Sequence, residues 1–211
     1  DAAGEVNQNP NYRMKRAIIA IIFCISLGLN AQVALPTFQG VQIIHCDNTL
    51  TVNQSDRGWY QSTGSHSASN DNTYTVKNSY YSWFTFDLSS FSGGACSVTL
   101  RLELENYATP ASTTTSTIWD VSTSHDDLVA SSSGSSGQTI FADLGGGNSY
   151  GSATFSNSDQ GSIIEYELSS QAISDVNSAA GGWFSVGTTM DDGSSGGFIR
   201  FSGGNDSRTH Q

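Results

Sequence analysis

The sequence is poor in charged residues, and in basic residues above all. Charged residues make up 13% of its 211 residues, and 8 Lys and Arg stand against 19 Asp and Glu, which gives a formal net charge of -11 at pH 7. A surface this acidic repels phosphate backbones and anionic lipid headgroups. The composition therefore disfavours nucleic acids and anionic membrane surfaces as partners, and it leaves sugars, cations and proteins.

Long hydrophobic runs are rare too, and the clearest one lies near the N-terminus. Residues 17–29 (AIIAIIFCISLGL) are apolar, the basic residues Arg13, Lys15 and Arg16 come before them, and the small residue Ala31 follows shortly after. This order is typical of a secretory signal peptide. A membrane anchor is the alternative interpretation, but spanning the hydrocarbon takes about 20 apolar residues.

The position of this run divides the chain into three expected segments. Residues 14–31 are expected to be the signal peptide, with cleavage after Ala31, and residues 1–13 an upstream translated or disordered segment. Residues 32–211 then form a single domain, since about 180 residues are enough for one hydrophobic core. We expect a secreted or cell-surface protein with no stable membrane span after cleavage.

Cysteine is scarce as well, with three in the whole chain. Cys24 lies inside the apolar run, without the small residues that precede a lipidated cysteine, so Cys46 and Cys96 remain in the mature chain. In an oxidising compartment two cysteines are expected to form one disulfide. Two free buried thiols are the alternative. A bond that closes a loop of about 50 residues would stabilise the fold by about 4 kcal/mol.

Helical periodicity is infrequent, whereas alternation of apolar and polar residues is common. In residues 97–105, Val98, Leu100, Leu102 and Leu104 alternate with polar residues, which predicts a strand with one buried face. Residues 162–168 repeat the pattern. The other strand candidates are residues 41–44, 49–53, 73–77, 80–86, 115–121, 183–188 and 198–202. We therefore expect an all-β fold, an antiparallel β-sandwich that is jelly-roll-like.

One short helix is expected to interrupt the strands. Ser169 or Ser170 can cap its N-terminus, residues 171–177 carry an apolar face, and Gly181 and Gly182 end it. We expect this helix at one end of the sandwich. The Gly- and Ser-rich residues 131–137 (SSSGSSG) and 145–147 are predicted to be flexible loops.

Taken together, several stretches resemble a secreted bacterial β-sandwich domain of the kind found in PEP-CTERM-type surface-exported proteins. These are residues 83–88 (WFTFDL), 98–104, 118–121 (IWDV), 141–151 (FADLGGGNSYG), 163–168, 171–177 and 182–187 (GWFSVG). The resemblance implies export and the sandwich fold, and little about activity. The chain departs from it in ending at Gln211 with no sorting tail, so the domain is expected to be either truncated at its C-terminus or released freely.

Catalytic motifs are absent from the sequence. The four histidines have no short metal-ligand spacing such as H-x-x-x-H, and no G-x-S-x-G nucleophile elbow occurs. Two carboxylates facing each other across a cleft could hydrolyse glycosides, but Glu103, Glu105, Glu165 and Glu167 are expected on solvent faces of strands. We therefore expect a protein that is not an enzyme, with an extracellular hydrolase as the second alternative.

Aspartates in Gly- and Ser-rich loops indicate a candidate site for a structural calcium ion, and the sequence suggests no other cofactor. The candidate ligands are Asp126 and Asp127, and Asp191 with Asp192, with Asp143 as a further member of this group. Carboxylates and loop carbonyls are the oxygen ligands that calcium prefers. The alternative is that these residues cap turns.

Aromatic side chains give the one candidate for a ligand site. Trp59 and Tyr60 fall in a Gly-, Gln- and Ser-rich segment and are expected to be exposed, where their rings could stack on sugars. Trp83 and Trp183 are expected in the core. The leading hypothesis is a non-enzymatic surface or matrix protein with a structural or adhesive role, and the first alternative is a carbohydrate-binding module. Extracellular polysaccharide or other copies of the chain are the expected partners.

Overall fold

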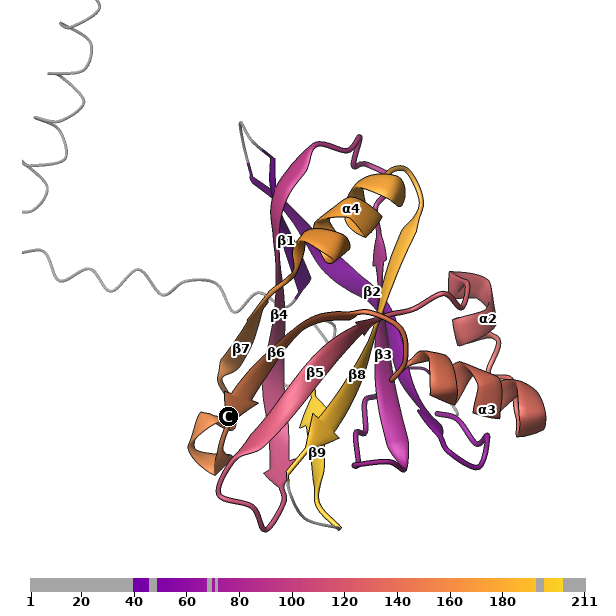
Figure 1. Cartoon of the computed structure of the whole chain (residues 1–211), viewed down its shortest axis with the longest axis vertical. Coiled ribbons are helices and arrows are strands. Elements are labelled where there is room, and N and C mark those ends of the chain that lie inside the picture. Colours follow the sequence, from indigo (N-terminus) through magenta and orange to yellow (C-terminus); the bar gives the residue numbers. More distant parts are fainter. Residues whose placement is uncertain (1–39, 46–48, 68–69, 71, 193–195, 203–211) are drawn as a thin grey trace, which may run out of the picture. The chain divides into compact units, whose positions relative to one another are not determined.

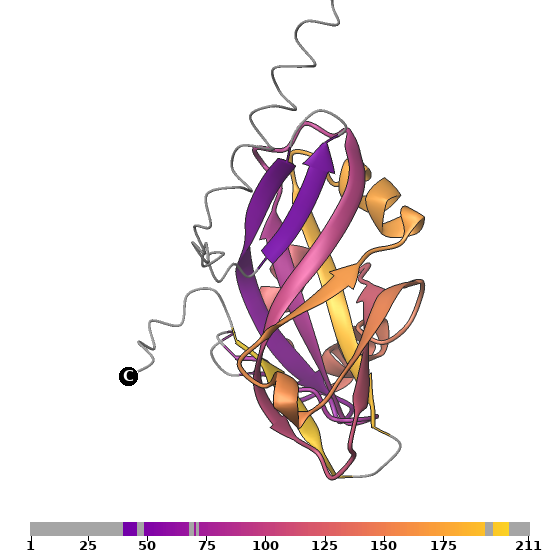
Figure 2. The same cartoon turned by 90° about the vertical axis from the view of Figure 1, so that its left-hand side faces the viewer.

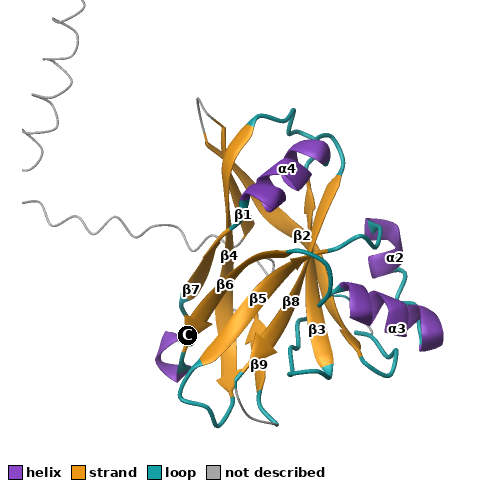
Figure 3. Cartoon of the chain, viewed as in Figure 1, coloured by secondary structure: helices purple, strands orange, loops and turns teal. Residues whose placement is uncertain are grey.

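Nine antiparallel strands carry the fold of the described residues (Figures 1 and 3). The computed structural model describes residues 40–45, 49–67, 70, 72–192 and 196–202, so the expected leader and upstream segment lie outside it. The strands are β1 (Gly40–His45), β2 (Thr49–Gln61), β3 (Tyr80–Asp87), β4 (Ala95–Ala108), β5 (Thr114–Asp120), β6 (Ser149–Phe155), β7 (Ile163–Glu167), β8 (Trp183–Asp191) and β9 (Phe198–Phe201).

Three α-helices and one 3₁₀ turn accompany the strands. They are α2 (His125–Val129), α3 (Gly134–Asp143), η1 (Asn157–Asp159) and α4 (Ser170–Ser178). In Figure 1, α2 and α3 lie together beside β3, whereas α4 crosses one end of the strands. No helix in the described part of the chain is long and apolar enough to cross a membrane.

The strands form one nearly closed antiparallel sheet that folds into two layers (Figure 2). Along the sheet the order is β6-β5-β8-β3-β2-β1-β4-β7, and β9 pairs with the far end of β4. The long strand β2 belongs to both layers, because residues 49–53 pair with β1 and residues 54–61 pair with β3. A bulge between Gln54 and Asp56 marks this change of layer, as bulges do where strands bend between sheets. The expected antiparallel, jelly-roll-like β-sandwich is confirmed.

Alternating residues of the long strand β4 fill the space between the layers. Leu100, Leu102 and Leu104 are fully buried, and they meet Phe84 and Phe86 of β3 in one continuous core. On the other face Arg101 forms an ion pair with Glu165 of β7, as expected for the solvent side of an antiparallel sheet. Fully burying a side chain of this size stabilises a fold by about 1.5–3 kcal/mol, so the period-two pattern determines which face of β4 points inward.

Helix α4 forms where the sequence predicts the single helix. The Ser169 side chain accepts a hydrogen bond from the backbone N–H of Ala172 at 3.4 Å, and Ala172 and Val176 are buried against the core. Gly181, with φ of 78°, follows the helix in the left-handed conformation. The helix crosses the end of the sandwich at which β4 begins, where Asn177 bonds the backbone of Ala95.

Helices α2 and α3 and strand β6 correct the sequence-based predictions. Residues 131–137 were expected to be a flexible loop, but α3 begins at Gly134. Residues 145–147 lie in a turn, as expected of a loop, and strand β6 (residues 149–155) was not predicted. The composition hid α3 because its first turns are Gly and Ser. Its apolar residue Ile140 and the following Leu144 complete a second core cluster with Tyr60, Trp83 and Leu128. This cluster covers the outer face of β3, which explains why residues 83–86 are buried on both faces.

The strand expected over residues 73–77 is wrong in its extent. Only isolated bridges form there, between Thr75 and Ile199 of β9 and between Val76 and Tyr80. The segment is nevertheless fixed, because the Thr73 hydroxyl donates to the carbonyl of Phe201 at 2.6 Å and accepts from its N–H at 2.8 Å. Residues 72–76 thus lie along the free edge of β9.

Candidate functional site

Trp59 and Tyr60 lie on opposite faces of strand β2, and only Trp59 reaches the surface. Tyr60 is 1% exposed and belongs to the second core cluster. Its hydroxyl donates to the carbonyl of Leu128 at 3.2 Å, and burial raises the pKa of this phenol. The expectation that Tyr60 is exposed is therefore wrong, because successive residues of a strand point to opposite faces and α2 and α3 cover one of them.

Trp59 lines a pocket of about 340 Å³, which we call the Trp59 pocket. Its walls come from β2, β3, β9 and the segment before β3, and they consist of Trp59, Asn72, Tyr74, Tyr80, Phe198 and Arg200. The pocket lies at the end of the sandwich where β9 pairs with residues 104–108 of β4, opposite the end that α4 crosses. Of these residues, the sequence indicated Trp59 as the exposed candidate, and Tyr80 only as one of many aromatic residues.

Strand register brings the aromatic residues of the Trp59 pocket together. Trp59 pairs with Ser82 of β3, so Tyr80, two residues away on the same face, is its diagonal neighbour. The bridge between Thr75 and Ile199 is antiparallel, which sets Tyr74 opposite Arg200. The sequence shows neither pairing, because both depend on contacts between segments far apart in the chain.

The four rings pack mainly edge to face. Trp59 and Tyr80 have ring centroids 5.2 Å apart at 69°, and Tyr80 and Tyr74 have centroids 4.9 Å apart at 83°. Phe198 lies 4.9 Å from Tyr74 at 39°. Such arrangements are favourable for aromatic rings, and they hold the pocket walls in fixed orientations before any ligand enters.

Two polar side chains complete the Trp59 pocket. The Trp59 indole N–H donates to Oδ1 of Asn72 at 3.0 Å, which fixes the plane of the ring. The Arg200 guanidinium carbon lies 5.4 Å from the ring centroid of Tyr74 and 5.5 Å from that of Phe198. These are cation–π distances, so the one charged side chain among the described lining residues rests against aromatic faces.

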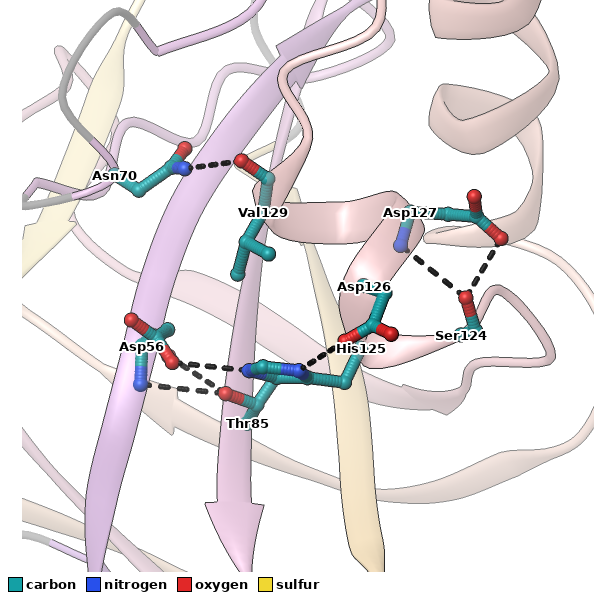
Figure 4. Close-up of polar contacts among 8 residues, drawn as sticks. All are labelled: Asp56, Asn70, Thr85, Ser124, His125, Asp126, Asp127 and Val129. Carbon is teal, nitrogen blue, oxygen red and sulfur yellow. Dashed lines mark hydrogen bonds and ion pairs between the residues drawn. The ribbon is translucent and has the colours of Figure 1, made fainter.

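A second pocket, of about 360 Å³, lies at the end of the sandwich that α4 crosses, and we call it the His125 pocket. His125, the first residue of α2, contacts Asp56 of β2 through Nε2 at 3.0 Å and Asp126 through Nδ1 at 3.1 Å (Figure 4). Its ring stacks on Trp183, with centroids 3.6 Å apart and planes 7° apart. The histidine thus attaches α2 to the start of β8.

Trp183 corrects a second expectation about aromatic burial. Trp83 is fully buried as predicted, but Trp183 is 41% exposed at the mouth of the His125 pocket. Its position in an apolar stretch gave no sign of this, because it is the first residue of β8 and precedes the part of the strand that enters the core.

Two carboxylates, Asp120 and Asp175, also line the His125 pocket. Asp120 accepts hydrogen bonds from the N–H of Asn148 at 2.7 Å and from its side-chain amide at 3.1 Å. Asp175 accepts from the Tyr150 hydroxyl at 2.7 Å and from Gln171 at 3.0 Å. Burial and the Asp175 hydrogen bond raise the pKa of Tyr150. The carboxylates therefore hold a turn, a helix and a strand in place.

The structure does not bring the expected calcium ligands together. Asp126 contacts His125, and Asp127 exchanges hydrogen bonds with the N-capping residue Ser124 (Figure 4). Asp191 forms an ion pair with Lys77, and Asp192 accepts from Thr109. His125 stacks on the first residue of β8 whereas Asp191 is its last, so the two aspartate pairs are separated by most of the strand. The described residues hold no group of three or more His, Cys, Asp or Glu side chains placed to bind a metal ion.

Only one cysteine of the expected disulfide lies among the described residues. Cys96 is an exposed residue near the start of β4, and Cys46 lies outside the described residues. The pairing of the two stays a prediction.

Comparison with family models and curated proteins found no match that could indicate a function. The similarity to surface-exported sandwich domains therefore stays an interpretation of the sequence.

Proposed function

We propose that the protein is an exported, non-enzymatic β-sandwich that binds carbohydrate in the Trp59 pocket and attaches to extracellular polysaccharide through it. This combines the adhesive role with that of a carbohydrate-binding module. Export rests on the signal peptide expected at residues 14–31, and the binding role rests on the pocket. Binding is proposed to need no metal ion.

The observation that carries the proposal is the pocket lined by Trp59, Tyr74, Tyr80 and Phe198. Aromatic rings offer apolar faces on which the C–H groups of a sugar ring can pack, while nearby polar groups bond its hydroxyls. Asn72 and Arg200 supply such groups here. A pocket of about 340 Å³ is within the size range of small-ligand sites.

The partial exposure of these four rings favours a binding role over a purely structural one. Core aromatics of the same sheet, such as Trp83, Phe84 and Phe86, are fully buried. Trp59, Tyr74, Tyr80 and Phe198 each keep an intermediate exposure instead. Rings that served only to close the end of the sandwich would gain most by being buried completely, so the retained exposure is consistent with a surface that a ligand covers.

The described lining of the Trp59 pocket supports binding more than catalysis. No carboxylate is among the described residues that line this pocket. In the His125 pocket, Asp120 and Asp175 are held by hydrogen bonds that organise the fold. Glycoside hydrolysis needs two carboxyl groups that flank the scissile bond.

Binding of the purified protein to a glycan array, followed by titration calorimetry with the best glycan, tests this function. Trp59→Ala should weaken binding about tenfold or more, because loss of one aromatic stacking contact is worth about 0.5–1.5 kcal/mol beyond the lost buried area. Trp183→Ala is the matched control, since it removes an exposed tryptophan from the other end of the sandwich and should leave the affinity unchanged.

Two results would contradict the proposal. One is an array with no bound glycan, with calcium or with chelator. The other is a bound glycan whose affinity Trp59→Ala leaves unchanged, which would place the site elsewhere. Thermal unfolding of both variants checks that they fold.

A further inference from the structure

We infer that the sugar unit bound in the Trp59 pocket is anionic and carries a carboxylate, as a uronic acid does. This inference names the ligand class of the site and rests on the proposed carbohydrate-binding function. The residue that carries it is Arg200 of β9.

Arg200 differs from Lys77 and Arg101 in having no carboxylate partner among the described residues. Lys77 pairs with Asp191 at 2.7 Å and Arg101 pairs with Glu165 at 2.9 Å. Within the described part of the chain, no carboxylate oxygen comes within ion-pair distance of Arg200. In a protein with a formal charge of -11, a cation left without a counter-ion is unusual, because acidic side chains are abundant.

The environment of Arg200 also leaves its Nε donor without a partner. Its Nε is buried and has no hydrogen-bond partner, and its guanidinium rests against the rings of Tyr74 and Phe198. A buried donor without a partner is unfavourable, and native proteins retain few of them. The aromatic contacts hold the planar guanidinium in place at the pocket wall. The inferred anion would bind there through the terminal N–H groups of Arg200.

The Trp59 pocket and the His125 pocket differ in the charge of their described lining residues. Among the described lining residues, the Trp59 pocket has Arg200 and no acidic side chain, whereas the His125 pocket has Asp120 and Asp175 and neither Lys nor Arg. An anionic group is therefore favoured in the first and disfavoured in the second. Repulsion from the rest of the acidic surface is screened beyond about 8 Å at physiological ionic strength, so the contact with Arg200 decides the local preference.

A carboxylate is the anionic group that we assign to this site. A guanidinium presents parallel N–H donors in a planar fork that matches the two oxygens of a carboxylate. A uronic acid places that carboxylate beside a pyranose ring, so one unit could meet both Arg200 and the aromatic walls.

Titration calorimetry with an oligouronate and with the same oligosaccharide after carboxyl reduction tests the inference. The two ligands share their ring skeleton and differ in charge. The unmodified protein should bind the oligouronate at least tenfold more tightly. Arg200→Gln should abolish this preference, because glutamine keeps polar groups at the pocket wall but carries no charge. Arg101→Gln, which removes an ion-paired arginine of β4, should keep the preference.

Trp59→Ala separates the inference from the function on which it rests. The carbohydrate site and its anionic ligand class are both supported if Trp59→Ala binds neither ligand and Arg200→Gln no longer prefers the oligouronate. If the unmodified protein binds both ligands equally in a Trp59-dependent manner, the anionic ligand class is wrong and the carbohydrate site stands. If it binds neither, or if Trp59→Ala binds both normally, the proposed site itself is wrong. A sulfated oligosaccharide that binds more tightly than the oligouronate would also overturn the carboxylate assignment.

A measurement on the unmodified protein guards against misfolding of Arg200→Gln. The preference for the oligouronate should shrink steadily as sodium chloride is raised, since an exposed ion pair is screened by salt. Affinity for the reduced ligand should change little over the same range. A preference that is independent of salt contradicts a charge contact with Arg200.

Discussion

Gly137 shows how one residue fixes the position of α3 on the sandwich. It is buried in the interior of α3, and a Cβ atom placed on it would overlap the carbonyl oxygen of Gly64, just beyond β2. The helix backbone therefore approaches the neighbouring loop more closely than any other residue would allow. Such close approach is one of the few reasons for a glycine inside a helix, where it is otherwise unfavourable.

We predict that Gly137→Ala destabilises the protein by about 1–3 kcal/mol, because an added methyl group must push α3 away from the loop. In an ordinary helix the same substitution stabilises by about 1 kcal/mol, so the sign of the effect is informative. The control is Ser136→Ala, one residue earlier on the exposed face of α3, which should leave the free energy of unfolding unchanged. Urea denaturation measures both, and a Gly137→Ala variant as stable as Ser136→Ala would contradict this account of the packing.

Residue identity also decides which parts of the candidate site could be predicted. Trp59 was found from composition alone, because an aromatic residue among polar ones attracts notice. Tyr74, Phe198 and Arg200 were not, since only the bridge between Thr75 and Ile199 brings them together. Tyr60 was misjudged because its burial depends on α2 and α3, which the sequence did not reveal.

The secondary-structure elements differ in how clearly the sequence specifies them. Strands β4 and β7 alternate strictly because each has one face in the core and one in solvent, and α4 has a serine cap and a glycine stop. Strand β3 gave no alternation, since the second core cluster covers its outer face. Helix α3 was hidden because its stabilising contacts are with other elements rather than within its own Gly- and Ser-rich first turns.

Asp143 joins α3 to the segment before α2. As the last residue of α3 it lies where a helix dipole disfavours negative charge, so its role is found in its contacts. Its carboxylate accepts from the N–H and hydroxyl of Ser122 at 3.0 and 2.7 Å, and from those of Thr123 at 2.8 and 2.6 Å. Burial acts to raise the pKa of this carboxyl, but these four hydrogen bonds outweigh it and lower the pKa below 3.8.

We predict that Asp143→Asn destabilises the protein by about 1–3 kcal/mol at neutral pH, because an amide cannot accept all four hydrogen bonds and leaves donors without partners. A lowered folded-state pKa means that the carboxylate contributes stability above the unfolded value of 3.8, and that this contribution is lost as the pH falls through the folded-state pKa. The difference in the free energy of unfolding between Asp143→Asn and the unmodified protein should therefore become smaller at pH values well below 3.8.

Chemical denaturation across this pH range measures the effect. Asp126→Asn is the control, because the Asp126 side chain is 97% exposed and should contribute little at any pH. A cost of Asp143→Asn that stays constant from neutral to acidic pH would show that the charge of Asp143 does not matter.

At the scale of the whole molecule, the two ends of the sandwich have different characters. One end carries α4, the His125 pocket and two pocket carboxylates, and the other carries β9, the Trp59 pocket and Arg200. The nearly closed sheet between them holds the continuous core. The acidic molecule therefore has a cationic, aromatic surface at the end that carries the Trp59 pocket. We place the binding site at that end for this reason.

The disulfide predicted between Cys46 and Cys96 acts on the molecule as a whole, because it would join the connection after β1 to the start of β4. The register supports the pairing. His45 of β1 lies opposite Ala95 of β4, and the bulge between Ile44 and His45 makes Cys96 the extra residue beside that pair. Cys46 follows His45 directly in the sequence, so the two cysteines are adjacent to paired positions.

We predict that residues 32–211, purified under oxidising conditions, contain no reactive thiol until a reductant is added. Mass spectrometry after alkylation under denaturing conditions measures this. Closing a loop of about 50 residues restricts the unfolded chain, and its loss should lower the free energy of unfolding by about 4 kcal/mol. The double variant Cys46→Ser/Cys96→Ser should show this loss without reductant and match the unmodified protein in its presence. Two alkylated cysteines in the unreduced protein, or equal stability of the two proteins without reductant, would mean that β1 and β4 are held by strand pairing alone.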